Sequence, residues 1–392
     1  MKWTNKGNEF DEIGNKFKGI EKIYIYGAGK LGSELFNILK FFDCFDCEIK
    51  FVDIDKEKQK SGFAGKKVLS PEELFQESKE NKIVVVAASQ INTKTIMNNL
   101  SVSGYKCGFD CFVMQEFMEY YLPIYSVYAK NKVFFPSISF LPTTRCNLNC
   151  AACLNFNPYN KNKIDQDLNI LKTDIDKFFE CVDYINLFHI SGGEPMLYSN
   201  MGELIEYIYN NYGEKIYNLT VTTNGTILPS SDLCKTIVKH NVSVILDDYS
   251  ESVPKSENKL KAIIERFDEI GVCYSINKVD FWVDLCPTTT NHSDWSEGEL
   301  INHYDSCKNP FQELRDQKLY SCNYASYAMK AGLNYDSCND YYDMTLFGDD
   351  KKKELVEFRL GYTEKGYVNF CKKCSALSTK INRNIVEVAK QI

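Results

Sequence analysis

Apolar residues fall in short runs along the chain, and most runs are followed by a stretch with helical periodicity. Near the N-terminus, a strand is expected over residues 22–26, an amphipathic helix over 33–42 and a second strand over 48–52. Further strands are expected over 83–88 and near 108–113. This order predicts an α/β module that ends by about residue 115.

Beyond a connection rich in Tyr and Phe at 116–135, predicted strands and helices alternate regularly. Their spacing is that of βα units of roughly 30 residues, which predicts a parallel sheet with right-handed crossovers. The expected strands are 137–141, 184–190, 218–222, 242–247 and 272–278, and the expected helices are 168–182, 201–211, 231–240 and 256–270.

The last hundred residues lack this alternation. Within them, Phe311–Cys322 is interpreted as a helix, a turn and a strand. The predicted organisation is a module over 1–115, a connection over 116–135, a sheet-and-helix domain over 136–290 and a small domain over 291–392.

Composition limits the class of protein. The 392 residues are 44% apolar and 14% aromatic, which is enough to build sizeable cores, and the net charge of −7 argues against dedicated binding to nucleic acid or anionic membranes. Residues 1–14 hold no apolar signal region, and no run approaches 18 apolar residues, so a cytoplasmic protein without a membrane partner is expected. Sixteen cysteines fall short of a disulfide scaffold, which favours reduced or metal-bound thiols.

The most informative motif is a C-x3-C-x2-C triplet, Cys146, Cys150 and Cys153, which follows the strand expected at 137–141. Three thiolates on one loop can hold three irons of a 4Fe-4S cluster, and the lack of a fourth nearby cysteine leaves one iron open to a ligand. The alternatives are weaker. A structural zinc site needs four ligands, usually in two separated pairs, and a disulfide needs an oxidising compartment.

The triplet resembles the cluster loop of radical S-adenosylmethionine (SAM) enzymes, and the resemblance covers about residues 136–290. It implies a partial (β/α)6 barrel whose open iron chelates SAM, and an electron that cleaves SAM to give a 5'-deoxyadenosyl radical. It also implies an external reductant such as flavodoxin or ferredoxin.

Three further predicted strand ends match SAM-binding positions of that family. The first resembles the GGEP motif that holds the methionyl ammonium, and the other two offer hydroxyl, amide and carboxylate groups to the carboxylate, ribose and adenine. Asn-Gly is also a common turn, and a strand-to-helix turn would explain the first motif without a ligand. The SAM contacts implied by the resemblance are Ser191, Gly192, Gly193, Glu194, Pro195, Thr223, Asn224, Asp247 and Tyr249.

One position departs from the family pattern. The residue before the third cysteine is often aromatic in this family and here is Ala152, so Phe156 or Tyr249 is expected to take over the adenine contact. His189 is interpreted as a core histidine that faces away from its neighbours Phe188 and Ile190.

Four later cysteines resemble the ligands of a twitch domain, a shortened relative of the SPASM domain that fully ligates one auxiliary 4Fe-4S cluster. A zinc site with the same thiolates is the alternative. Cys338 lies between the second and third of these cysteines and is an alternative to Cys322. The expected ligands are Cys307, Cys322, Cys371 and Cys374.

The N-terminal module carries a dinucleotide-type fingerprint. Gly27, Gly29 and Gly32 follow the first strand, and Asp53 lies 21 residues after Gly32. The module resembles the small Rossmann-like domains of enzymes in envelope polysaccharide pathways, which implies one bound nucleotide with its ribose on Asp53. The alternative is a fold that keeps its glycines for packing.

Two cysteine pairs in this module, Cys44 with Cys47 and Cys107 with Cys111, are interpreted as ordinary thiols, with a shared metal site as the alternative.

The expected function is hydrogen abstraction from an alcohol carbon of a nucleotide-linked sugar or polyol, with oxidation or dehydration as the result. The candidate acids are Asp248, Asp280, Asp284 and His292. A SPASM-type maturase of a ribosomal peptide is the main alternative. An iron-sulfur structural or sensor protein is the third possibility, and the GGEP-like run argues against it.

Overall fold

The computed structural model describes residues 10–42, 47–254, 256–307, 311–335, 337–360 and 365–392. The chain folds into two compact units. The smaller one is Asn5–Pro136, and the larger one is built from Ser137–Ile392. Cys44 lies outside the described residues. Within them, no helix is long and apolar enough to cross a membrane.

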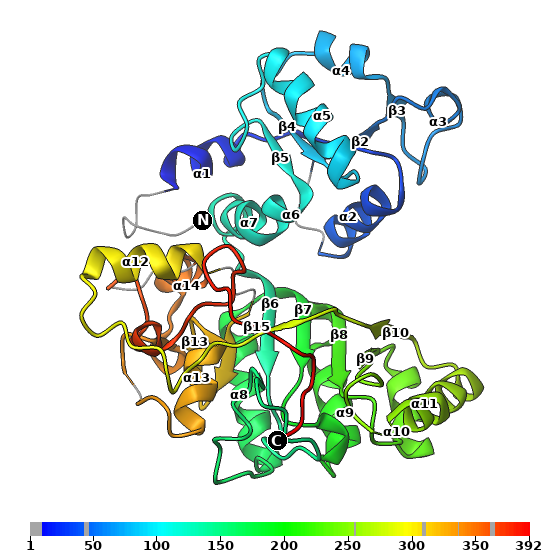
Figure 1. Cartoon of the computed structure of the whole chain (residues 1–392). Helices are drawn as coiled ribbons and strands as arrows, with labels where there is room; N and C mark the ends of the chain where they lie inside the picture. Colours follow the sequence, from blue (N-terminus) through cyan, green and yellow to red (C-terminus); the bar gives the residue numbers. More distant parts are fainter. Residues whose placement is uncertain (1–9, 43–46, 255, 308–310, 336, 361–364) are drawn as a thin grey trace. The chain divides into compact units, whose positions relative to one another are not determined.

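The smaller unit is built on a parallel five-stranded sheet with the order β3-β2-β1-β4-β5 (Figure 1). This is the order of the first five strands of a doubly wound dinucleotide-binding sheet. Its strands are β1 Lys22–Tyr26, β2 Glu48–Val52, β3 Val68–Leu69, β4 Lys82–Val86 and β5 Cys111–Val113. Its helices are α1 Asp11–Lys18, α2 Lys30–Phe41, α3 Lys56–Ser61, α4 Pro71–Gln76, α5 Gln90–Val102, α6 Met114–Glu116 and α7 Leu122–Lys130, with a π-helix at Phe117–Tyr121 between the last two.

The larger unit is built on an eight-stranded mixed sheet with the order β10-β9-β8-β7-β6-β12-β13-β14. The five strands β6 to β10 are joined by helices that pack against one another in chain order. These strands are β6 Phe134–Phe140, β7 Tyr184–Ile190, β8 Ile216–Thr223, β9 Ser243–Asp247 and β10 Tyr274–Asn277, and the helices are α8 Leu168–Cys181, α9 Met201–Tyr212, α10 Ser231–Lys239 and α11 Ser256–Ile270.

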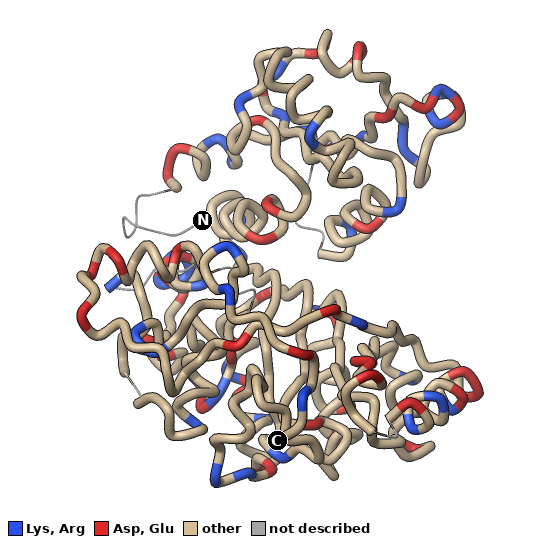
Figure 2. The backbone as a smooth tube through the Cα atoms, viewed as in Figure 1, with Lys and Arg blue, Asp and Glu red and all other residues tan. Residues whose placement is uncertain are grey.

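The remaining part of this unit follows β10. It comprises β11 Trp282–Val283, α12 Glu297–Ser306, β12 Glu313–Arg315, β13 Lys318–Tyr320, α13 Asn323–Lys330, β14 Tyr341–Asp343, α14 Lys352–Arg359 and β15 Ile385–Val386. Basic and acidic residues are interspersed along α3 and α11 (Figure 2).

The helix predicted at the start of Phe311–Cys322 is wrong. Glu313–Arg315 forms β12, which pairs with Ser139 of β6 and, in antiparallel fashion, with β13. Asp316 and Gln317 both have positive φ, 52° and 54°, and close a two-residue turn. The Asp174 carboxylate on α8 accepts hydrogen bonds from both turn amides, at 3.0 and 2.7 Å. These distant partners override the helical preference of the segment.

Candidate active site

A cavity of about 450 Å³ lies at the carboxyl ends of β6, β7, β8 and β9. All three cysteines of the triplet line it, together with eight residues from the strand ends after β7, β8 and β9: Ser191, Gly192, Gly193, Thr222, Thr223, Asn224, Asp247 and Tyr249. The structure therefore brings the triplet together with most of the SAM contacts predicted from the sequence.

Two thiols of the triplet accept hydrogen bonds from nitrogen donors. Cys146 Sγ accepts from the Leu148 amide at 3.4 Å, and Cys150 Sγ accepts from Gln391 Nε2 at 3.1 Å. Burial raises the pKa of Cys146 to about 12 and that of Cys150 to about 11. Iron binding would displace the thiol protons. Three thiols on one cavity wall fit the donor set of an iron-sulfur cluster with an open iron.

The glycines of the GGEP-like run pack this loop against the cysteine loop. A Cβ on Gly193 would lie 2.1 Å from the Arg145 carbonyl oxygen, and one on Gly192, whose φ is +154°, would lie 2.6 Å from that of Thr143. The Gly193 amide donates to the Thr143 carbonyl oxygen at 2.9 Å, and the Glu194 amide donates to that of Arg145 at 2.7 Å. The absence of side chains thus lets two backbones meet, and both glycines still line the cavity.

Glu194 joins the ends of β7 and β8. Its side chain is fully buried and does not line the cavity. One carboxylate oxygen accepts from Thr223 Oγ1 at 2.6 Å and from the Met196 amide at 2.9 Å, and the other accepts from the Asn224 amide at 2.8 Å. Burial raises its pKa. Pro195, which begins a 3₁₀ turn, is also buried outside the cavity lining.

Among the described residues that line the cavity, Asp247 is the one carboxylate. Its oxygens accept hydrogen bonds from Tyr249 Oη at 2.9 Å and from Asn277 Nδ2 at 2.7 Å, and burial raises its pKa. The four acids proposed from the sequence lie elsewhere, since none of Asp248, Asp280, Asp284 and His292 lines this cavity. His292 stacks on Trp295, with ring centroids 3.6 Å apart, in a separate cavity of about 490 Å³.

A group of polar side chains in the cavity wall joins Ser191, a predicted SAM contact, and His189 to three residues that were not predicted as site residues, Ser139, Thr222 and Tyr327. Ser139 Oγ lies 2.9 Å from Tyr327 Oη and 3.3 Å from Ser191 Oγ, and His189 Nε2 lies 2.7 Å from Thr222 Oγ1. We call Ser139, His189, Ser191, Thr222 and Tyr327 the hydroxyl cluster.

Burial lowers the pKa of His189 to about 4, so its imidazole is neutral at physiological pH. The sequence did contain a signal for this residue, because alternation with the buried Phe188 and Ile190 directs His189 to the other face of the sheet.

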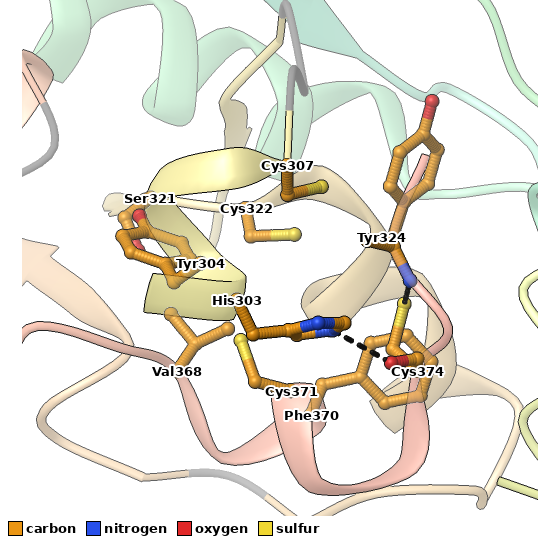
Figure 3. A pocket seen from close by; sticks show the side chains of 11 residues that line it. His303, Tyr304, Cys307, Ser321, Cys322, Tyr324, Val368, Phe370, Cys371 and Cys374 are labelled. Atoms are coloured by element: carbon orange, nitrogen blue, oxygen red, sulfur yellow. Dashed lines mark hydrogen bonds between the residues drawn. The ribbon is translucent and has the colours of Figure 1, made fainter. Parts of the chain in front are cut away.

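The four later cysteines surround a second, enclosed cavity of about 40 Å³ (Figure 3). The Leu377 amide donates to Cys307 Sγ at 3.4 Å, and the Ala376 amide donates to Cys374 Sγ at 3.3 Å. Cys322 lines this cavity, whereas Cys338 is exposed and does not. Burial, and then the neighbouring thiols, raise the pKa of Cys374. The set of four convergent thiols fits a fully ligated cluster.

Within the described residues, no three His, Cys, Asp or Glu side chains are placed to hold a single metal ion.

The glycines of the loop in the smaller unit differ in their surroundings, since some contact neighbouring backbone closely and one has free space around it. Gly27 has a φ of +122°, and a Cβ on Gly32 would lie 1.9 Å from the Gly27 carbonyl oxygen. A Cβ on Gly29 would meet nothing within 4 Å. Asp53 accepts hydrogen bonds from the Ala28 amide at 2.7 Å and from the Asp55 amide at 3.0 Å. The glycine loop after β1 is thus hydrogen-bonded to Asp53 at the end of β2.

The remaining thiols of this unit include one close pair. Cys107 Sγ and Cys111 Sγ lie 3.7 Å apart.

Part of the larger unit is similar to known proteins. Residues 140–273 match the sequence model of the Radical SAM superfamily. An uncharacterized protein of Methanocaldococcus jannaschii is 29% identical over 132 residues, which are 31% of this chain and 45% of that protein. A probable GTP 3',8-cyclase of Methanococcus aeolicus is 36% identical over 91 residues, 22% of this chain and 28% of that protein.

The chain thus spans less than half the length of the curated relatives it matches. Among solved structures, BtrN in complex with AdoMet and 2-DOIA is 16% identical with a TM-score of 0.39, and the match covers 65% of this chain and all of that one. The match to the Radical SAM superfamily thus lies within the larger unit.

Proposed function

We propose that this protein is a radical SAM enzyme that abstracts hydrogen from an alcohol carbon of a sugar or polyol. The observation that carries the proposal is that the cysteine triplet, most of the predicted SAM contacts and the hydroxyl cluster line one cavity. A 4Fe-4S cluster on the triplet would supply the electron that cleaves SAM to methionine and a 5'-deoxyadenosyl radical.

The chain's own residues would bind and orient SAM. Gly192 and Gly193 lie in the cavity wall, where their backbones are open to the methionyl group. Asp247 and Tyr249 offer a carboxylate and a hydroxyl to the ribose. In this proposal Glu194 acts as a positioning residue, because its carboxylate fixes Thr223 and the Asn224 amide and lies outside the cavity.

The chemistry of the cavity wall supports a neutral, hydroxylated substrate. Hydroxyl groups and a neutral imidazole can both donate hydrogen bonds to and accept them from a polyol. Of the described residues that line the cavity, none is Lys or Arg. A phosphate would have no cationic partner there, so we place any nucleotide portion of the substrate outside this cavity.

The outcome of the abstraction depends on the groups near the resulting radical. Four thiols of the second cavity would hold an auxiliary cluster that accepts an electron during oxidation to a ketone. Dehydration instead needs an acid near the leaving hydroxyl, and Asp247 is the single carboxylate among the described residues of the cavity wall.

The test is release of 5'-deoxyadenosine from SAM by the anaerobically reconstituted, reduced protein. Free polyols and sugars, nucleotide-linked sugars and short peptides are supplied in turn, with dithionite or flavodoxin as reductant. We expect release to increase with a sugar or polyol. Stimulation by peptides alone would instead favour a peptide maturase.

Two cysteine variants control this experiment. Cys146→Ala should abolish release, whereas Cys273→Ala, which removes an exposed thiol outside the cavity, should leave it unchanged. Release by the Cys146→Ala variant would overturn the proposal.

A further inference from the structure

The C-terminal segment 385–392, which we call the strap, packs on the cysteine loop (Figure 1, red). It begins as β15, which pairs with β11. Farther on, the Ala151 amide donates to the Lys390 carbonyl oxygen at 2.7 Å, and the Ile392 amide donates to that of Asn149 at 3.1 Å. The Ala389 side chain is fully buried in a cluster with Cys150 and Val253. The strap is therefore held on both sides of Cys150.

Gln391 makes a hydrogen bond with the cysteine thiol itself. Its Oε1 accepts from the Asn149 amide at 2.8 Å, and its Nε2 donates to Cys150 Sγ at 3.1 Å and to the Ala389 carbonyl oxygen at 2.6 Å. The Asn149 N–H can only donate and the Ala389 carbonyl can only accept, so these two partners fix which end of the amide faces the thiol. That end is the donor.

We propose that Gln391 is a positioning residue of the cluster on the triplet, which rests on the function proposed above. A hydrogen bond to a cluster sulfur stabilises negative charge on it and thereby favours the reduced cluster, which carries one more electron. Partners behind the ligands also fix the ligands' orientation. Gln391 thus makes the cluster easier to reduce and holds Cys150 in the cavity wall.

Substitution of Gln391 separates these effects from general damage to the strap. Gln391→Leu removes the N–H donor to Cys150 and leaves a side chain of similar size. Gln391→Glu keeps an oxygen that can accept from the Asn149 amide, but it replaces the N–H donor by a negatively charged oxygen. Lys390→Leu is the matched control, because the Lys390 side chain is exposed and only its backbone carbonyl meets the cysteine loop.

The readout is the midpoint potential of the EPR signal that responds to SAM, measured after iron content has been determined. We expect a shift to lower potential in Gln391→Leu, a larger one in Gln391→Glu and none in Lys390→Leu. At a fixed potential near the midpoint, the ratio of reduced to oxidised cluster should fall roughly threefold in Gln391→Leu, as expected for loss of one hydrogen bond.

Each alternative result has a separate meaning. Equal potentials in all four proteins, or an equal shift in Lys390→Leu, would overturn the role of Gln391 while the cluster itself stands. If Gln391→Leu fails to bind iron, the potential of Gln391→Glu decides the question, and loss of iron in both variants but not in Lys390→Leu supports a role in holding Cys150. Absence of a SAM-responsive signal in the unsubstituted protein would instead contradict the proposed function.

Discussion

Single side chains in the cavity owe their protonation state to burial. His189 shares a hydrogen bond with Thr222 through Nε2, while its Nδ1 has no hydrogen-bond partner among the described residues. A protonated imidazole at this buried position would lose its hydration. Burial therefore disfavours the charged form and lowers the pKa of His189 from 6.5 to about 4. A neutral imidazole can accept a hydrogen bond from a substrate hydroxyl, whereas an imidazolium can only donate.

The low pKa of His189 predicts a specific pH dependence of stability. Between pH 6.5 and 4 the unfolded chain binds a proton that the folded protein excludes, so the free energy of unfolding falls as the pH falls. In a His189→Gln variant this contribution is absent. From pH 7 to 4.5, urea denaturation of the apoprotein should show the unsubstituted protein losing about 2 kcal/mol more than the variant.

The unsubstituted protein and the His189→Gln variant share all other histidines. The difference between their losses of unfolding free energy therefore measures the contribution of His189. Parallel losses across this pH range would show that His189 titrates normally in the folded state.

At the scale of elements, the two loops after β6 and β7 form one unit because Gly193 has no side chain. A methyl group there would need a backbone shift, since the atom it would meet, 2.1 Å away, is a carbonyl oxygen of Arg145. The same contact aligns the cysteine loop with the strand ends that line the cavity.

We therefore expect Gly193→Ala to destabilise the protein by about 2 kcal/mol and to lower the iron bound by the triplet. Gly298→Ala in α12 is the control, because a Cβ there meets nothing within 4 Å and helix propensity should raise stability by about 0.5 to 1 kcal/mol. Chemical denaturation and iron analysis measure both effects. Normal stability and iron content in Gly193→Ala would show that the loops adjust without cost.

The elements that the sequence predicted well have local causes. For α8, α10 and α11 the expected bounds agree with the structure within one residue. The spacing of their apolar residues is a property of each segment, and α8 and α10 are also capped by the residue that precedes them, Asp167 and Ser230. Strand β12 was predicted as a helix because the β12–β13 hairpin depends on Asp174, 142 residues before its turn, and on pairing with β6. The hydroxyl cluster likewise combines strand residues with Tyr327 of α13, which no local pattern connects.

At the scale of the molecule, the spacing of the cysteines predicted two sets of thiols. In the structure the two sets line two different cavities. If both sets hold 4Fe-4S clusters, the reconstituted protein should contain about eight irons per chain. A Cys371→Ala, Cys374→Ala double variant should contain about four and still bind SAM. Iron and zinc analysis with equilibrium dialysis of SAM tests this, and one zinc with about four irons in the unsubstituted protein would favour the zinc alternative.

The strap also has a consequence for biosynthesis. Gln391 lies 241 residues after Cys150, so the cysteine loop emerges from the ribosome long before the amide that contacts its thiol. At translation rates of 5 to 20 residues per second, this delay is roughly 10 to 50 s. During that time the triplet remains open on the side that the strap later covers. Cluster insertion in this interval would meet a more accessible loop, before the strap packs on it.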